Sequence, residues 1–260
     1  MIKQIGVIGS GQMGAGIALV CAQSSFETYI FEESPAARMK AQGYFDRKTD
    51  PSIRKPDFVT LEELAGCDLI IEAIPEQEDL KRELFIKLDE LSRPKTILAS
   101  NTSSISITKI AGWTKNPERV MGMHFMNPVP VMKLVELIRG LQTSDETYQT
   151  VQQTAQALGK ITTTSKDMPG FIANRILMPM INEAFFALQE NLASAEDIDT
   201  TMRLGANHPM GPLALADFIG LDTCVWILET MDKKPCPLLK QYVDAGWLGK
   251  KSGRGVFSYV

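Results

Sequence analysis

The stretch that decides the fold, "IGVIGSGQMGAGIALVCA" at residues 5–22, joins an apolar run, a glycine turn and an Ala-rich helix. Gly9, Gly11 and Gly14 form the pattern GxGxxG. The first glycine permits a tight turn, the second lets a pyrophosphate approach the backbone, and the third lets the helix pack on the strand. The helix N-terminus offers N–H groups and a positive dipole end to an anion. The motif therefore predicts a dinucleotide site made by Gly9, Ser10, Gly11, Gln12, Met13 and Gly14.

A second strand, "TYIFE" at residues 28–32, ends on Glu32, about 20 residues beyond the glycine turn. A carboxylate at this point hydrogen-bonds the adenosine ribose and repels a 2′-phosphate. The pattern therefore favours NAD over NADP as the cofactor. The alternative is a structural glycine turn with a solvated Glu32.

Short apolar runs alternate with amphipathic segments along residues 1–166, which predicts βαβ units and a mainly parallel, doubly wound α/β sheet. The expected strands lie at 4–9, 28–32, 67–74, 96–101, 120–125 and 134–138. Residues 167–260 show long apolar stretches at helical spacing and no convincing strand. We expect an N-terminal Rossmann-type domain at 1–166 and an all-helical domain at 167–260.

Composition narrows the class of protein. A formal net charge of −4 and a pI of about 5.4 argue against nucleic acid as a partner. No apolar run reaches the roughly 18 residues of a membrane span, and no signal-peptide pattern opens the chain. We expect a cytoplasmic protein. The four cysteines show no CxxC pair and no metal spacing with histidine, so buried free thiols and no metal site are expected.

Two ionisable residues, His124 and Glu136, lie among apolar residues within "GMHFMNPVPVMKLVE" at residues 122–136. His124 ends an apolar strand, where ligands of open α/β sheets bind. Glu136 lies in the next apolar run and can steady the imidazole as a proton acceptor. Such a base suits hydride transfer from an alcohol to NAD. The alternative is a core histidine with locally satisfied nitrogens. For the other histidine, His208, which precedes a proline in "ANHPMGP", we expect a structural role.

Long strings resemble those of the short-chain L-3-hydroxyacyl-CoA dehydrogenases over nearly the whole chain. They are "VIGSGQMGAGIA", "LASNTSSISIT", "GMHFMNPVPVMKLVELIRG", "PGFIANRILMPMINEA", "ANHPMGPLALADFIGLD" and "GWLGKKSGRG". The resemblance implies NAD-dependent oxidation of a short L-3-hydroxyacyl-CoA, such as 3-hydroxybutyryl-CoA, to the 3-ketoacyl-CoA, and the reverse reduction. It also implies a substrate cleft between the two domains and a homodimer formed through the helical one.

The resemblance assigns roles residue by residue. His124 matches the catalytic histidine, Glu136 its orienting glutamate, and Ser103 and Asn174 the substrate-side serine and asparagine. The NAD contacts beyond the glycine turn match Glu32, Ala73, Glu76, Lys81, Ser103, Asn127 and Lys251. Glu32 stands where the family more often has aspartate. The neutral side chains of Ser103 and Asn174 suit a hydroxyl and a thioester carbonyl, although either residue type also caps helices.

The chain departs from the family between Glu32 and Asp68, where 35 residues replace a longer segment that contacts the coenzyme A nucleotide in relatives. The remnant at 38–58 still carries an excess of cations that can attract phosphates, or it is a solvated loop. A substrate held on a carrier protein's phosphopantetheine arm requires fewer protein contacts to a coenzyme A nucleotide. A carrier-linked hydroxyacyl dehydrogenase of a biosynthetic pathway is therefore the second hypothesis, and a non-catalytic NAD-binding protein is the third.

Overall fold

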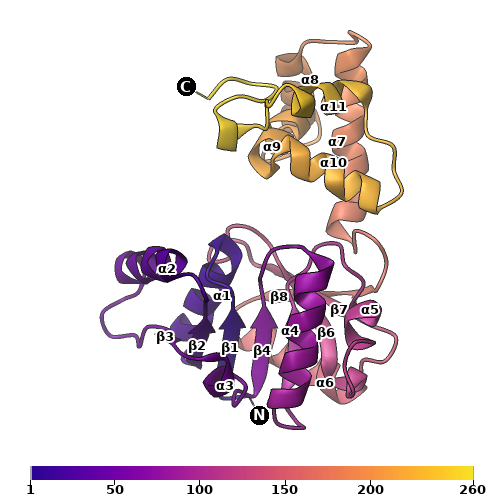
Figure 1. Cartoon of the computed structure of the whole chain (residues 1–260). Coiled ribbons are helices and arrows are strands. Elements are labelled where there is room, and N and C mark those ends of the chain that lie inside the picture. The colour runs from indigo at the N-terminus through magenta and orange to yellow at the C-terminus, as the bar shows by residue number, and fades with distance from the viewer. Residues whose placement is uncertain (1, 260) are drawn as a thin grey trace. The chain divides into compact units, whose positions relative to one another are not determined.

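The structure is a computed structural model that describes residues 2–259. The chain divides into two compact units, Met1–Phe171 and Ile172–Val260, and each is described by itself. The first unit is built on one eight-stranded sheet and the second is helical (Figure 1). This is the α/β class that the alternating apolar pattern predicts. The assignment of cofactor, substrate and dimer roles to the two predicted domains stays a prediction.

The sheet contains the six expected strands and two others. Its strands are β1 (Gln4–Ile8), β2 (Glu27–Phe31), β3 (Asp57–Phe58), β4 (Leu69–Glu72), β5 (Ile97–Ser100), β6 (Val120–Phe125), β7 (Leu134–Arg139) and β8 (Ile161–Lys166). Their order is β3-β2-β1-β4-β5-β6-β7-β8, and only the β6–β7 pair is antiparallel. The sequence did not predict β3, which has two residues, or β8, "ITTTSK", which is largely polar and exposed.

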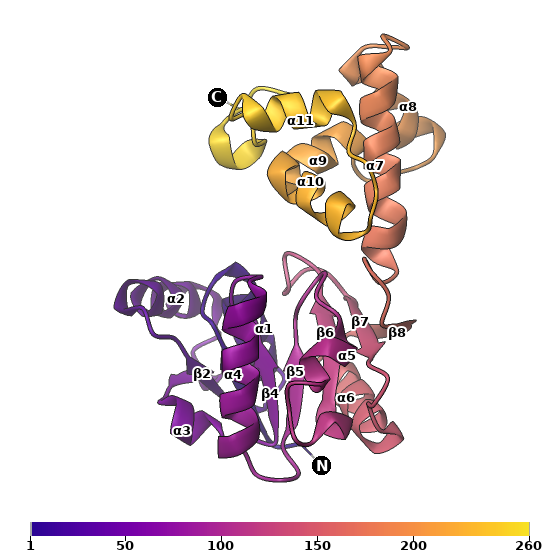
Figure 2. The same cartoon turned by 45° about the vertical axis from the view of Figure 1, so that its right-hand side comes forward.

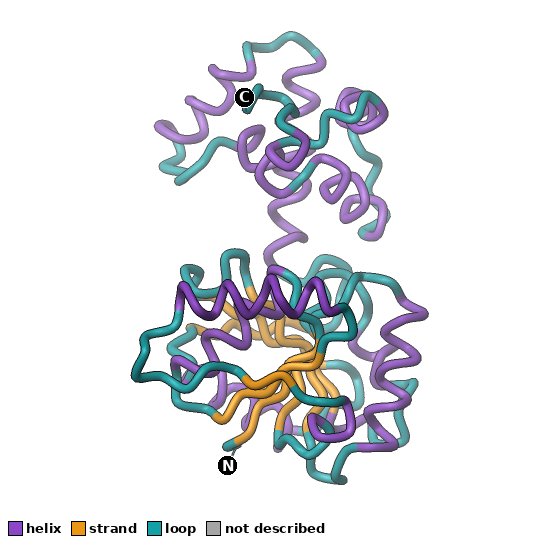
Figure 3. The backbone as a smooth tube through the Cα atoms, turned by 60° about the vertical axis from the view of Figure 1, so that its left-hand side comes forward, coloured by secondary structure: helices purple, strands orange, loops and turns teal. Residues whose placement is uncertain are grey.

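Helices cover both faces of this sheet (Figures 1 and 2). They are α1 (Gln12–Gln23), α2 (Pro35–Lys48), α3 (Leu61–Leu64), α4 (Glu78–Leu91), α5 (Ile107–Ala111) and α6 (Asp145–Ala157), with a 3-10 turn, η1 (Pro117–Arg119). One apolar core joins α1, α2 and α6 to the sheet, and a separate core joins α3, α4 and α5 to it. Figure 3 shows the twisted strands enclosed by these helices. Burial on both faces explains why the central strands read as continuous apolar runs.

The strand order places a topological switch point at the carboxyl end of the sheet. Strand β1 is central, with β2 on one side and β4 on the other. After β1 the chain continues to β2 on one side, and after β4 it continues to β5 on the other side. Open α/β folds bind their ligands at the point where the strand order reverses in this way. The glycine turn that follows β1 lies at this position.

The second unit packs five helices around its own apolar core. They are α7 (Ala173–Gln189), α8 (Ala195–Gly205), α9 (Pro212–Ile219), α10 (Leu221–Thr230) and α11 (Pro237–Asp244), with a 3-10 turn, η2 (Lys250–Ser252). Ser194 accepts a hydrogen bond from the Asp197 backbone and so caps the N-terminus of α8. Among residues 2–259, no helix combines the length and apolar character of a membrane span.

All four cysteines are free and buried, as expected from the sequence. Burial raises the pKa of Cys21, Cys67 and Cys224 to about 12. At pH 8 their thiolate fraction is then roughly a thousandfold below that of an ordinary thiol. We expect a thiol-specific chromogenic disulfide to react slowly with the folded protein and quickly with four thiols after denaturation in guanidinium. Rapid reaction of these three thiols in the folded state would contradict the assigned burial.

Candidate active site

The glycine turn has the geometry that close approach of a ligand requires. Gly9 has a positive φ of 92°, and a Cβ on it would lie 2.8 Å from the carbonyl oxygen of Ala73. A Cβ on Gly14 would overlap the carbonyl oxygen of Gly9. A Cβ on Gly11 would meet no atom within 4 Å, so packing does not require glycine there. The N-terminus of α1 has no side-chain cap. These features fit a pyrophosphate at this turn.

Glu32 is held against the glycine turn at the end of β2. One carboxylate oxygen accepts hydrogen bonds from the Ser10 backbone and hydroxyl at 2.8 and 2.9 Å. The other accepts from the Ser34 backbone at 3.0 Å. Desolvation opposes ionisation, but these hydrogen bonds outweigh it and lower the pKa of Glu32 below its ordinary value. Glu32 therefore presents a fixed negative charge beside the turn.

This charge gives a test of cofactor choice. We expect NADH to bind at least about tenfold more tightly than NADPH, because Glu32 would repel a 2′-phosphate. The variant Glu32→Gln should narrow this difference, as measured by fluorescence titration. The adjacent Glu33→Gln is the matched control, since it removes an exposed charge and should leave the preference intact. Equal affinities of the unmodified protein for NADH and NADPH would remove Glu32 from this role.

Other residues that the sequence assigned to the cofactor also lie near the carboxyl edge of the sheet. Ala73 follows β4 beside Gly9. Gln12, in the first turn of α1, donates to the side chain of Asn127 at 3.1 Å and so links the glycine turn to the segment after β6. Met13 packs against the apolar core that α1 shares with the sheet.

His124 and Glu136 form a directly opposed pair on the antiparallel strands β6 and β7. His124 Nδ1 lies 2.8 Å from Glu136 Oε2, and both side chains are buried. Because a carboxylate only accepts, the contact requires a proton on Nδ1, which leaves the lone pair of the neutral ring on Nε2. The Phe171 ring meets the imidazole edge to face, with centroids 5.8 Å apart. The pair can accept a proton and stabilise the resulting imidazolium.

Ser103, Glu76 and Lys81 lie together on the loops after β4 and β5 and the first turn of α4. Glu76 accepts a hydrogen bond from the Ser103 backbone at 3.0 Å and forms an ion pair with Lys81 at 3.1 Å. The other two assigned residues belong to the second unit. Asn174 lies in the first turn of α7, and Lys251 in η2 donates to Asp222 at 2.7 Å. Their roles stay predictions.

Two residues that sequence reasoning missed help to build this edge. Asn101 accepts a hydrogen bond from the Phe125 backbone at 2.9 Å, next to His124. Glu72 is fully buried at the end of β4 and contacts Lys81 at 2.5 Å. An acid inside the apolar run "CDLIIEAI" was a usable signal, because the same observation singled out Glu136. Asn101 offered no such signal.

Comparison with known families covers both units. A model of the NAD binding domain of 3-hydroxyacyl-CoA dehydrogenase matches residues 4–168, and a model of the C-terminal domain of that enzyme matches residues 170–259. With the glycine turn at the sheet switch point, the first match defines an NAD-dependent oxidoreductase. Because the two matches span almost the whole chain, it belongs to the 3-hydroxyacyl-CoA dehydrogenase family, and it oxidises L-3-hydroxyacyl-CoA with NAD.

Individual relatives agree with this family. The chain is 51% identical to the probable 3-hydroxybutyryl-CoA dehydrogenase of Bacillus subtilis, over 99% of this chain and 98% of that protein. It is 47% identical to the 3-hydroxybutyryl-CoA dehydrogenase of Bradyrhizobium diazoefficiens, over 100% and 96%. The crystal structure of (S)-3-hydroxybutyryl-CoA dehydrogenase PaaH1 from Ralstonia eutropha superposes with a TM-score of 0.93 at 44% identity, covering 100% of both chains.

Proposed function

We propose that this chain interconverts a short L-3-hydroxyacyl-CoA, of the size of 3-hydroxybutyryl-CoA, and its 3-ketoacyl-CoA, with His124 as the general base and Glu136 as its orienting partner. The observation that carries the catalytic part is the 2.8 Å contact between His124 Nδ1 and Glu136 Oε2 inside the sheet. The short chain length is supported by the names of the relatives that are 47–51% identical.

In the oxidation, His124 Nε2 accepts the proton of the 3-hydroxyl group as the C–H bond at C3 gives up a hydride. Bound NAD supplies the acceptor for that hydride. In the reduction, the imidazolium returns the proton to the carbonyl oxygen as hydride arrives at C3. A base positioned within hydrogen-bond reach of the proton that it removes lowers the barrier of such a step.

Glu136 acts through His124. Its carboxylate receives the Nδ1 proton, fixes the ring orientation and lowers the energy of the imidazolium that proton transfer creates. Burial strengthens this interaction, because little water competes with the hydrogen bond. Ser103 supplies a neutral hydrogen bond to the substrate oxygen at C3, and it adds no charge near the path of the hydride.

A direct assay tests the activity. Acetoacetyl-CoA, NADH and a proton should yield 3-hydroxybutyryl-CoA and NAD, followed as loss of NADH absorbance. We expect turnover in the ordinary enzymatic range of about 1–1000 per second. Longer 3-ketoacyl-CoA substrates should give lower kcat/KM. Absence of turnover with every 3-ketoacyl-CoA, although NADH binds, would support a non-catalytic NAD-binding protein instead.

A carrier-linked thioester is the second candidate substrate. The alignment with the Bacillus subtilis protein spans 280 positions, whereas this chain has 260 residues, so the relative carries residues that this chain lacks. Within the shortened segment, Lys55 pairs with Asp46 at 2.7 Å and Arg54 pairs with Asp57, which reduces the charge available to a nucleotide. Acetoacetyl-CoA, acetoacetyl-pantetheine and acetoacetyl-carrier protein should be compared. Equal kcat/KM with and without the CoA nucleotide would favour the carrier.

We also propose that the second unit forms a homodimer. Leu192 and Leu204 are three-quarters exposed, although they are large and apolar. A hollow of about 520 Å³ on this unit is lined mainly by apolar side chains, including Leu192, Met180 and Ile198. Exposed apolar surface of this kind marks interaction sites. Light scattering should report about twice 28.7 kDa, and a monomer at working concentration would refute the dimer.

A further inference from the structure

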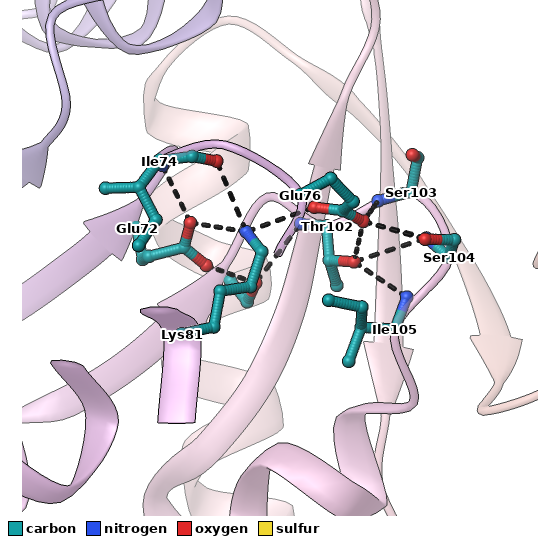
Figure 4. Close-up of polar contacts among 9 residues, drawn as sticks. Glu72, Ile74, Glu76, Lys81, Thr102, Ser103, Ser104 and Ile105 are labelled. Atoms are coloured by element: carbon teal, nitrogen blue, oxygen red, sulfur yellow. Dashed lines mark hydrogen bonds and ion pairs between the residues drawn. The ribbon is translucent and has the colours of Figure 1, made fainter. Parts of the chain in front are cut away.

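A buried lysine lies between two glutamates at the carboxyl edge of the sheet (Figure 4). Lys81, in the first turn of α4, is 1% exposed. Its ammonium group contacts Glu72 Oε1 at 2.5 Å and Glu76 Oε2 at 3.1 Å, and it donates to the Ile74 carbonyl at 3.4 Å. An ammonium group has three N–H donors, and each finds an acceptor here. The positive charge of Lys81 is therefore balanced by carboxylates of the protein itself.

Glu72 fixes the lysine from the side of the sheet. Its carboxylate also accepts hydrogen bonds from the Ile74 backbone at 2.8 Å and the Ser100 hydroxyl at 2.6 Å. Ile74 follows β4 and Ser100 ends β5, so Glu72 ties two neighbouring strand ends together. A buried carboxylate with this many partners has a single orientation, and it holds Lys81 in one place.

Glu76 extends the connection to the loop after β5. Its Oε1 atom accepts hydrogen bonds from the Ser103 backbone at 3.0 Å and from the Ser104 backbone and hydroxyl at 3.2 and 2.9 Å. The Thr102 hydroxyl donates to the same oxygen. Burial alone would raise the pKa of Glu76, but Lys81, Thr102 and Ser104 together outweigh it, and the pKa lies below its ordinary value. Glu76 therefore stays ionised and keeps all these acceptor contacts at neutral pH.

The loop that Glu76 holds carries Ser103. In the proposed function, Ser103 hydrogen-bonds the substrate oxygen at C3. Ser103 donates its backbone N–H to Glu76, and Figure 4 shows its hydroxyl pointing away from that carboxylate. The side chain of Ser103 thus remains available, while its backbone is fixed. Without Glu76, the N–H groups of residues 103 and 104 would lose this shared acceptor. Such loops then sample many conformations, and positioning errors of about 1 Å are costly to catalysis.

We propose that Glu72, Lys81 and Glu76 form a positioning relay that holds the Ser103 loop in its substrate-binding conformation. This inference rests on the proposed function, because it gives Ser103 a role at the substrate. Lys81 and Glu72 act through Glu76, and Glu76 acts through the backbone of Ser103. Toward Ser103, all three act as positioning residues, and the NAD contacts predicted for Glu76 and Lys81 are a separate role. Thr102, which both donates to Glu76 and accepts from the Ile105 backbone at 2.8 Å, completes the loop anchor.

A double-mutant cycle on kcat/KM for acetoacetyl-CoA tests the relay, with NADH saturating for every variant so that the NAD contact predicted for Glu76 does not enter. Glu76→Gln keeps the size of the side chain but cannot serve both Lys81 and the loop, because one of its two terminal atoms becomes a donor. We expect Glu76→Gln and Ser103→Ala each to lower kcat/KM about tenfold or more. The double variant should have a kcat/KM within about twofold of that of Ser103→Ala alone. Once the Ser103 hydroxyl is absent, losing the loop conformation that positions it has no further effect. Multiplicative losses would overturn the proposal.

A second variant and a second measurement keep the proposal testable even where the Glu76→Gln protein cannot be obtained in folded form. If Glu76→Gln does not fold, Thr102→Val, which is nearly isosteric, should show the same non-additivity with Ser103→Ala. Glu83→Gln, an exposed glutamate on α4, is the matched control and should leave kcat/KM unchanged. Amide hydrogen exchange of the intact protein needs no activity. The amides of Ser103 and Ser104 should exchange at least about tenfold faster in Glu76→Gln, with α5 unaffected. Unchanged exchange would overturn the relay.

The two hypotheses fail in different ways. An unmodified protein without reductase activity would contradict the proposed function, and the exchange experiment would still decide whether Glu76 anchors the loop. An active protein with multiplicative losses, or with unchanged exchange at residues 103 and 104, would contradict the relay alone.

Discussion

Replacing His124 with glutamine is expected to lower kcat by roughly two to four orders of magnitude, the usual effect of removing a general base. Glutamine can still donate a hydrogen bond to Glu136, so the buried carboxylate keeps a partner and the fold should survive. It cannot accept a proton and become a cation. Steady-state kinetics with acetoacetyl-CoA and NADH measure the loss, and NADH titration should give a Kd within about threefold of the unmodified protein.

His208 provides the matched control for this experiment. It is the only other histidine of the chain, it lies in the second unit, and the sequence predicts a structural role for it. His208→Gln should change kcat less than about threefold. If His124→Gln loses less than tenfold in kcat, another residue performs the proton transfer. If it loses NADH affinity to the same extent as kcat, the loss comes from the cofactor site and not from acid–base chemistry.

Replacing Lys81 with methionine should destabilise the first unit by about 3–5 kcal/mol, the usual cost of removing one partner from a buried ion pair. Methionine fills similar space but leaves Glu72, which is fully buried, without its cation. The loss is measured by urea denaturation followed by circular dichroism.

Two further variants separate this effect from a general sensitivity of α4. Lys87→Met removes an exposed lysine of the same helix, which lies 4.0 Å from Glu62, with side chains 56% and 66% exposed. It should cost less than about 1 kcal/mol. Adding Glu72→Gln to Lys81→Met should recover part of the lost stability, because the double variant has no buried charge at this position. A Lys81→Met protein as stable as the Lys87→Met protein would contradict the assigned burial of the pair.

Much of the fold was predictable because its signals are local. Most of the expected strands, such as β4, β5 and β6, are apolar runs buried on both faces of the sheet, so their composition marks them directly. The glycine turn was predictable because its residues serve backbone geometry within one βαβ unit. The β8 strand was not, because "ITTTSK" lies at the sheet edge, has mostly exposed side chains and offers no apolar run. Its pairing with β7 depends on tertiary contacts that no local pattern records.

The candidate site was predictable where a residue broke its local pattern. His124 and Glu136 stand out as ionisable groups in apolar runs, and the structure places them in contact. Lys81 was assigned through family resemblance alone, because a lysine on an amphipathic helix usually faces water. Its burial arises from Glu72 and Glu76, which reach it from β4 and the loop after β4. Such a network depends on which residues the fold brings side by side. A sequence pattern therefore does not reveal it.

The antiparallel pairing of β6 with β7 has a consequence for how such proteins can diversify. Opposed residues on paired strands keep a separation fixed by the hydrogen-bonded ladder, with strand axes about 4.8 Å apart. The His124–Glu136 spacing is therefore set by this ladder and not by the length of the segment between Glu32 and Asp68. The segment between Glu32 and Asp68 can shrink or grow while the two side chains proposed for proton transfer keep their spacing. The length of this surface segment and the geometry of the proposed proton-transfer pair can thus change independently in this architecture.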